Sequence, residues 1–260
     1  MRFDMKEKTN ILLGLFVASL ILANVLGSKI TQFDLPSFIS TPLNILFFPI
    51  IYALKTFLLT MGGREISLGF FNTISVSVGI LTVPLMFLIT DIIAEVHGKK
   101  KVMEFITTGV IALLLMIVIT SIAIAVPASE RSIDNNSFSM IFKATIRMTI
   151  ASILAFVIAQ VHDLWAFEFW KRKTEGKHLW LRNNASTVVS QLIDSVVFMF
   201  VAFYKTAPMW DAIFVISLIV PFWIFKIFCA LLDTPFAYLG VWWLRKDQIQ
   251  KNVRTRLALS

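Results

Sequence analysis

Long apolar segments separated by short polar connectors dominate the chain. A transmembrane helix needs roughly 20 apolar residues, and six windows meet this length: residues 10–28, 76–96, 103–126, 145–169, 186–204 and 211–240. The pattern predicts an all-α, polytopic membrane protein with six transmembrane helices. Because the connectors leave no room for a separate soluble domain, we expect residues 1–260 to form a single integral membrane domain.

A seventh apolar segment, residues 43–60, contains Pro49 and Lys55 and directly follows Pro42. Lys and Arg accumulate in cytoplasmic loops, and six crossings place all four basic clusters on one side: residues 2–8, 99–101, 171–182 and 245–256. A seventh crossing would separate the first cluster from the other three. We therefore expect residues 31–73 to form an extracytoplasmic re-entrant or interfacial hairpin, with both termini in the cytoplasm.

Composition supports the membrane class, since 57% of the residues are hydrophobic and the mean hydropathy is +0.80. The net charge of +8 could suggest a nucleic-acid partner, but the basic clusters lie where the positive-inside rule places them, so anionic lipids are the expected counter-charge. The first apolar segment follows a basic stretch as in a signal peptide, but its length favours a retained helix. The single Cys229 excludes an internal disulfide.

Two carboxylates interrupt apolar segments: Asp91 in VGILTVPLMFLITDIIAEV and Asp194 in VVSQLIDSVVFMFVAF. A carboxylate at the bilayer centre costs about 2.5–3.5 kcal/mol on insertion scales, so it is retained where it faces a bundle interior, a partner charge or a substrate path. Lys226 could be the counter-ion. The structural alternative is a buried ion pair that fixes helix register. The pattern makes transport the leading hypothesis.

Further polar residues continue these positions at helical spacing, where residues three, four or seven apart share a face. The expected stripes, which could converge on one cavity, are Asp91 with Glu95, Gln160 with Asp163, Gln191 with Asp194, Lys226 with Asp233, and Asn24 in the first helix. Glu95, Asp163 and Asp233 lie near helix ends, where an ordinary interfacial role is an equal alternative. The related segments LITDII and QLIDSV suggest a 3+3 inverted repeat.

Four segments together resemble the queuosine precursor transporter family, also called the vitamin uptake transporter-like or YhhQ family. They are NILLGLFVASLILANVLGSKI, PLMFLITDIIAEVHGKKK, SILAFVIAQVHDLWAFEFWKRKTEGKHLWLRNNASTVVSQLIDSVVFMFVAF and FKIFCALLDTPFAYLG. The resemblance implies a bacterial inner-membrane importer of deazaguanine bases such as preQ0, preQ1 or queuine, which are salvaged for queuosine in tRNA. The protein itself would contact its substrate and membrane lipids but no nucleic acid, and a homodimer is possible.

Carried over by motif, the family's site residues fall on Thr90, Asp91, Glu95, Gly98, Gln160, Asp163, Arg182, Asn183, Asn184, Gln191, Asp194, Lys226 and Pro235. Two features depart from the family: His97 replaces a usual aromatic residue, and residues 31–73 are longer than the corresponding loop. Some branches carry a basic residue at the position of Glu95. A universal role for Glu95 is therefore less secure than one for Asp91, Asp163, Asp194 or Lys226.

The chemistry of a deazaguanine fits these residue types, because its edge presents two adjacent N–H donors that one carboxylate can accept. Asp91 or Asp194 could bind this edge, and Gln191 or Asn184 could pair with the carbonyl. The stacking candidates are Phe87, Trp165, Phe198 and Trp223.

The sequence contains no nucleotide-binding motif, so we expect a secondary transporter, in which a desolvated carboxylate could take up a proton with the substrate. Facilitated diffusion is the simpler alternative. A second alternative is the substrate-binding component of an energy-coupling-factor system, docking through small residues such as Ala18 and Ala23. An enzyme is not expected, since His162 and Asp163 are adjacent and point to different faces. We expect no metal and no cofactor.

Overall fold

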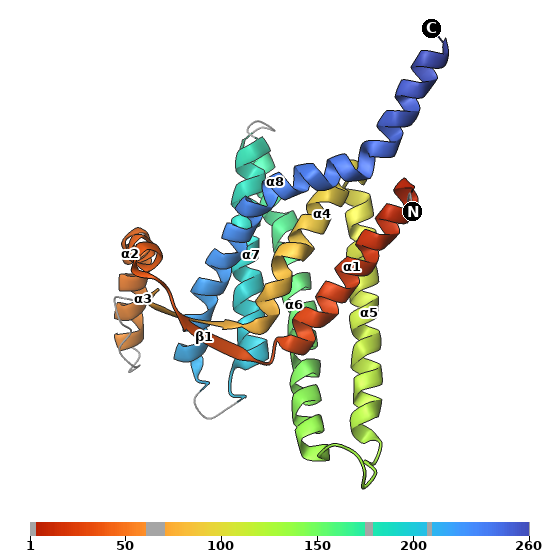
Figure 1. Cartoon of the computed structure of the whole chain (residues 1–260). Helices are drawn as coiled ribbons and strands as arrows, with labels where there is room; N and C mark the ends of the chain where they lie inside the picture. Colours follow the sequence, from red (N-terminus) through yellow and green to blue (C-terminus); the bar gives the residue numbers. More distant parts are fainter. Residues whose placement is uncertain (1–3, 61–70, 175–178, 207–209, 260) are drawn as a thin grey trace. The chain divides into compact units, whose positions relative to one another are not determined.

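The computed structural model describes residues 4–60, 71–174, 179–206 and 210–259. Helices dominate it, and the elements follow one another along the chain as labelled in Figure 1. Their bounds are α1 Met5–Leu26, β1 Ile30–Asp34, α2 Ser37–Leu46, α3 Phe48–Thr60, β2 Thr73–Ser77, the 3-10 helix η1 Val78–Thr82, α4 Val83–His97, α5 Lys99–Ala125, α6 Asn135–Lys173, α7 Leu179–Phe203 and α8 Ala212–Leu259.

Four stretches within the described residues are long and apolar enough to cross a membrane: Met5–Leu26, Val78–His97, Lys100–Ala125 and Asn135–Ala159. The chain is therefore a multi-pass membrane protein. The last two expected crossings fall within α7 and α8, whose described apolar stretches are the shorter Val188–Phe203 and Phe214–Ile227. That the chain crosses the membrane six times, and that its two halves form an inverted repeat, remain predictions.

Several expected boundaries were wrong. The second window was expected to be helical from residue 76, but residues 76–77 belong to β2, and residues 78–82 form η1. The α-helix starts at Val83, with Pro84 in its first turn, where the missing N–H of proline has no helical partner to lose. α6 begins well before residue 145, and α8 continues through the basic tail. Hydropathy therefore locates the apolar part of a helix and not its ends.

Contacts divide the chain into two compact units. The first unit comprises Met1–Leu26, Gly79–Ile146 and Lys226–Ser260, and the second comprises Gly27–Val78 and Arg147–Phe225. The single membrane domain expected from the sequence stays a prediction.

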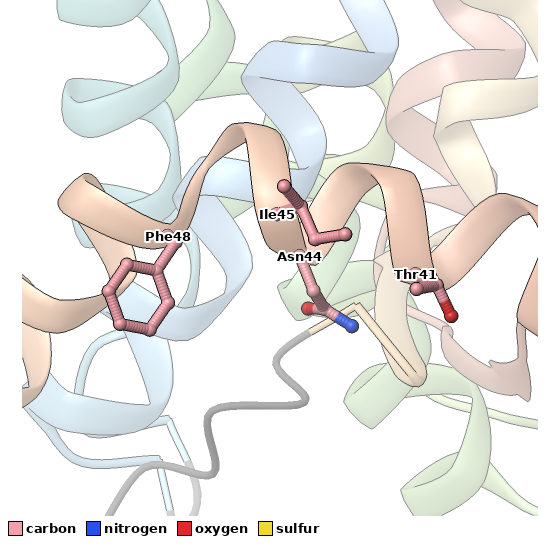
Figure 2. A pocket seen from close by; sticks show the side chains of 4 residues that line it. All are labelled: Thr41, Asn44, Ile45 and Phe48. Atoms are coloured by element: carbon pink, nitrogen blue, oxygen red, sulfur yellow. The ribbon is translucent and has the colours of Figure 1, made fainter.

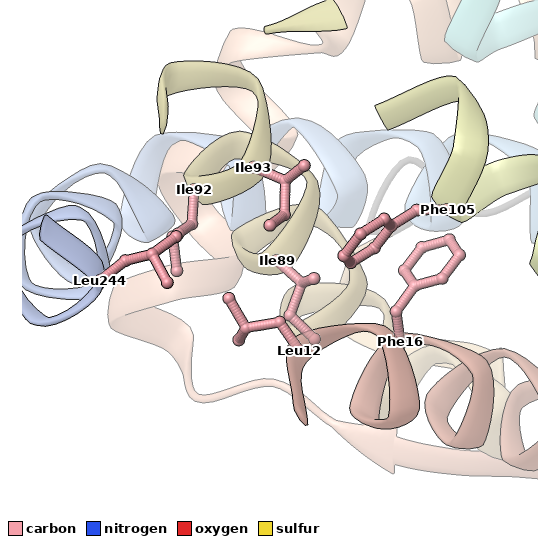
Figure 3. Close-up of a cluster of buried hydrophobic side chains, with 7 residues drawn as sticks. All are labelled: Leu12, Phe16, Ile89, Ile92, Ile93, Phe105 and Leu244. Carbon is pink, nitrogen blue, oxygen red and sulfur yellow. The ribbon is translucent and has the colours of Figure 1, made fainter. Parts of the chain in front are cut away.

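The first unit is held by one cluster of buried apolar side chains from α1, α4, α5 and α8 (Figure 3). Its members are Leu12, Phe16, Ile89, Ile92, Ile93, Phe105 and Leu244. The rings of Phe16 and Phe105 lie with their centroids 6.1 Å apart. Since α5 otherwise exposes large apolar residues such as Leu115 (61% exposed), one side of this helix packs inward and the other suits lipid.

Polar contacts join the helix ends of the first unit next to this cluster. Lys8, with only 6% of its surface exposed, donates from Nζ to the carbonyl of Trp243 at 2.9 Å. The hydroxyl of Thr9 donates to Met5 O, so its oxygen accepts the hydrogen bond from His97 Nε2 at 3.0 Å. The N-terminal turns of α1 are therefore fixed to both α4 and α8.

In the second unit, β1 and β2 form an antiparallel ribbon in register from Ile30 opposite Ser77 to Asp34 opposite Thr73. Residues 30–77, called the hairpin below, contain α2 and α3 between these strands. Phe47 separates the two helices, which are about 15 and 20 Å long at 1.5 Å per residue, against about 30 Å of bilayer hydrocarbon. Residues 43–60 are therefore not one spanning helix. The ribbon is a small exception in a structure that is otherwise helical, as the sequence predicted.

Close packing of α8 on α4 depends on Gly240. A Cβ atom at this position would lie 2.1 Å from Ile92 Cδ1 and 2.7 Å from Ile92 Cγ1. We predict that Gly240→Ala destabilises the protein by about 1–3 kcal/mol, the usual cost of overpacking, and that adding Ile92→Ala restores part of the loss. The measurement is the thermal unfolding midpoint in detergent.

The matched control is Gly14→Ala in α1, where an added Cβ meets nothing within 4 Å. This change should be neutral or slightly stabilising, because alanine favours a helix. Equal losses at Gly14 and Gly240 would contradict the packing argument.

Candidate functional site

One face of α7, in the second unit, carries polar side chains at helical spacing. Ser190, Asp194 and Phe198 follow one another at four-residue intervals and so share this face. Ser190 is buried, with 5% of its surface exposed, and Asp194 is half-buried. The half-buried Gln191 lies next to Ser190 in the sequence. The backbone carbonyl of Gln191 accepts a hydrogen bond from the hydroxyl of the fully buried Ser195 at 2.8 Å. The spacing expected from the sequence therefore places Asp194 beside other polar groups.

Neighbouring helices of the same unit meet α7 at this level. His162 Nδ1 of α6 lies 3.1 Å from Ser190 Oγ, one turn before Asp194. From α8, Trp223 Nε1 donates to the carbonyl of Val188 at 3.3 Å. α6 thus contacts α7 at Ser190 and α8 contacts it at Val188, so three helices meet within two turns of Asp194. Ligand sites of helical bundles lie between helices in this way.

Aromatic rings extend the same face of α7. Phe198 stacks on Phe222 of α8, with a centroid distance of 5.9 Å and an interplanar angle of 15°. Phe198 also meets Phe203 edge to face at 6.3 Å. Trp165 instead stacks on Phe169 at 5.7 Å and remains 64% exposed. The ring of Trp165 also lies 5.9 Å from that of His162. Among the expected stacking residues, Phe198 thus lies one turn from Asp194. Trp223 contacts α7 at Val188, and Trp165 lies beside His162 on an open surface.

A charge that the sequence reasoning missed lies in α6. Arg147 donates from Nε to Val201 O at 2.7 Å and from Nη2 to Tyr204 O at 2.8 Å. These carbonyls belong to the end of α7, where helical partners run out, and Lys205 follows in the left-handed region with φ 56°. Arg147 lies inside the fourth expected crossing, so the rule that singled out Asp194 could have found it.

The first unit contains further described candidates, among them Asn24, Phe87, Asp91, Glu95 and Lys226. Asn24 is buried, with 3% exposure, and its Nδ2 donates to Leu20 O one turn back in α1. Asp91 lies on the exposed side of α4, whereas Ile92 and Ile93 enter the apolar cluster.

Glu95 and Lys226 have different surroundings. Glu95 Oε1 lies 3.7 Å from Arg245 Nη2, and the same nitrogen donates to the Glu95 carbonyl at 2.8 Å. Both side chains are partly exposed to the surroundings, so this pair can be explained as a salt bridge that links α4 to α8. Lys226 is buried, with 7% exposure, which fits a charge that a membrane helix keeps away from lipid. Phe87 is half-buried.

Some expected site residues lie outside the part of the chain whose side chains are described: Gln160, Asp163, Arg182, Asn183, Asn184 and Asp233. Among the described residues, no group of three or more His, Cys, Asp or Glu side chains could hold a metal ion. A notch of about 340 Å³ on the hairpin is lined by Thr41, Asn44, Ile45 and Phe48 (Figure 2). None of these four residues was expected in the site.

The sequence model of a family described as "Putative vitamin uptake transporter" matches residues 77–240, which is more than half of the chain. The chain belongs to this family. The resemblance recognised in the sequence is thereby confirmed. The matched range includes α4, α5, α6, α7 and the part of α8 that holds Trp223 and Lys226, and it leaves out Asn24 and most of the hairpin.

Three curated relatives are similar to this chain. "Probable queuosine precursor transporter" of Bacillus subtilis (strain 168) is 30% identical over 167 residues, which are 63% of this chain and 70% of the relative. The protein of the same name from Haemophilus influenzae is 28% identical over 130 residues, 50% of this chain and 52% of the relative.

"Queuosine precursor transporter" of Escherichia coli (strain K12) is 28% identical over 129 residues, 49% of this chain and 55% of the relative. The chain thus spans about half the length of the last two relatives. No solved structure matches the chain.

The two hydrogen bonds of Arg147 lead to a stability prediction. Hydrogen bonds to charged groups contribute about 1.5–3 kcal/mol each, so Arg147→Ala should lower the unfolding midpoint markedly by leaving the end of α7 without donors. Arg147→Lys, which keeps the charge but loses the planar donor pair, should lie between Ala and the parent. Thermal unfolding of the detergent-solubilised variants measures the difference.

Arg131→Ala serves as the control, because Arg131 lies exposed between α5 and α6. Its loss should change the midpoint little. An Arg147→Ala variant as stable as Arg131→Ala would show that the end of α7 does not depend on the guanidinium.

Proposed function

We propose that this protein imports queuosine precursors, as deazaguanine bases, across the bacterial inner membrane. The observation that carries the proposal is the family membership together with three relatives that share one transporter name. The α7 face gives further support, because Asp194 lies in an apolar segment between Ser190, which contacts His162 at 3.1 Å, and Phe198, which stacks on Phe222.

Substrate recognition would use the α7 face. A carboxylate accepts two adjacent N–H donors in a bidentate manner, and this is the role we give to Asp194 for the guanidine-like edge of the base. The amide of Gln191 would donate to the carbonyl of the base. One face of the Phe198 ring already stacks on Phe222. Phe198 would therefore contact the base with the part of its ring that Phe222 does not cover. The specific base is proposed to be preQ0, preQ1 or queuine.

The mechanism we propose is secondary transport, because the sequence carries no nucleotide-binding motif. Both termini would lie in the cytoplasm, in line with the basic clusters near them. Asp91 and Lys226 of the first unit would contribute to the substrate path, since ionisable residues within membrane helices mark such paths. The relatives are named as transporters and not as binding components of an energy-coupling-factor system, so that alternative gains no support. The homodimer stays an untested prediction.

The first test replaces Asp194 with Asn in a bacterial strain that neither synthesises queuosine nor has its own importer. Loss of one hydrogen bond to a charged group costs about 1.5–3 kcal/mol, and 1.4 kcal/mol is a factor of about ten. At low external concentration of each base, supplied singly, we expect the queuosine content of tRNA to fall at least tenfold relative to the parent.

Asp211→Asn is the matched control. Asp211 Oδ1 accepts the backbone N–H of Phe214 at the start of α8, and asparagine caps a helix equally well, so this variant should transport as the parent does. Membrane levels of both variants are measured by immunoblot. If the well-expressed parent restores queuosine with none of the bases, the proposed substrate class is wrong.

Proton coupling is tested in proteoliposomes that contain only this protein. If a carboxylate carries a proton inward with the base, an inwardly directed proton gradient should increase the initial uptake rate of the parent several-fold. Asp194→Asn reconstituted at equal density should show no such increase. Equal rates for the parent with and without the gradient would favour facilitated diffusion.

A further inference from the structure

The hairpin turns large apolar side chains outward. Phe38 is 76% exposed, Ile45 71%, Leu46 70% and Tyr52 57%. In α2 the buried residue is the polar Ser40, with 3% exposure. A helix that faces water buries its apolar side and exposes its polar side, so the polarity of α2 is the reverse of that expected in water.

These exposed residues do not reflect poor packing of the hairpin, because other apolar residues of the hairpin already form a packed interior. Phe71 and Ile51 are each only 2% exposed, and the rings of Phe71 and Phe47 lie 5.6 Å apart. Asn44 joins α2 to the residues just before β2: its Oδ1 accepts a hydrogen bond from Phe71 N at 2.9 Å, and its Nδ2 donates to Asn72 Oδ1 at 3.0 Å. The apolar exterior therefore belongs to a folded unit.

Charge is almost absent from α2 and α3. Lys55 is the only charged residue between Leu35 and Thr60 in the sequence, and the other charged residues of the hairpin are Asp34, Arg64 and Glu65. An interface with another protein usually surrounds its apolar centre with a polar and charged rim, which the two helices themselves do not supply. A hydrocarbon environment needs no such rim.

The ribbon fixes the depth of the hairpin. β1 begins four residues after the end of α1, and β2 leads directly into η1 and α4; both α1 and the η1–α4 stretch are candidate membrane spans. Within the described residues the sheet has two strands, and Gln32, Phe33 and Asp34 of β1 are exposed. An open strand edge that faces lipid is not tolerated in hydrocarbon, so we expect the ribbon to lie at hydrated depth. α2 starts only three residues after β1 ends.

We propose that α2 and α3 lie within the lipid interface, at the end of α1 opposite to its basic start, with Phe38, Ile45 and Leu46 inserted among the acyl chains. Tyr52 fits this depth, since tyrosine is enriched at membrane interfaces. The structure thereby favours an interfacial over a re-entrant hairpin. The notch of Figure 2 is lined by the polar side chains of Thr41 and Asn44 and by the apolar side chains of Ile45 and Phe48, a mixture that suits the boundary between lipid headgroups and acyl chains.

The test measures depth by spin labelling of single cysteines in lipid nanodiscs. Phe38→Cys and Leu46→Cys are made in a Cys229→Ser background, with Cys229→Ala as a second background in case the first does not fold. Glu130→Cys, in the exposed connector between α5 and α6, is the water control. Leu115→Cys, on the exposed apolar side of α5, is the lipid control. The readout is the ratio of collision rates with oxygen and with a water-soluble nickel chelate.

For both hairpin labels we expect a ratio several-fold above that of Glu130→Cys and below that of Leu115→Cys. A ratio equal to that of the water control would overturn the proposal, because the hairpin would then project into water. Protection from both reagents, with dipolar broadening that disappears on dilution with unlabelled protein, would also overturn it and assign the surface to a second copy of the chain. Neither result depends on whether the protein transports deazaguanines.

Discussion

The cost of placing a polar or charged group in hydrocarbon governs this protein more than any other constraint. Arg147 meets it by donating to Val201 O and Tyr204 O, which themselves need donors at the end of α7. Lys8, at the start of α1, is buried and donates to Trp243 O. Each of these hydrogen bonds pairs a charged group with a backbone carbonyl of another helix or its end, so the charges of the helices also position neighbouring helices.

This constraint separates structural charges from candidate functional ones. Glu95 pairs with Arg245 where neither side chain is buried, and a pair of this kind contributes little to stability. Asp194 is instead half-buried on the α7 face that holds the Ser190–His162 contact. A half-buried carboxylate one turn from a polar contact between two helices is better suited to bind a solute, and the proposed role of Asp194 in substrate recognition relies on this difference.

Packing and chemistry are distributed unevenly over the chain. The apolar cluster of the first unit joins α1, α4, α5 and α8 around Ile92 and Leu244, and Gly240 permits the close approach. The polar face of α7 belongs to the second unit, as does the hairpin. The family match covers residues 77–240, so the polar face lies in the part shared with relatives, and most of the hairpin lies outside it.

The sequence alone determined the membrane class, the family and the separation of residues 43–60 from the ordinary spanning helices, because hydropathy, charge and motif spacing are properties of the chain itself. It also placed Asp194 on a polar helical face, since the period of a helix is known in advance. It missed the ribbon of β1 and β2, the true starts of α4 and α6, and Arg147 as a cap on α7. Those features depend on which backbone groups meet across long sequence separations, and only the tertiary structure decided them.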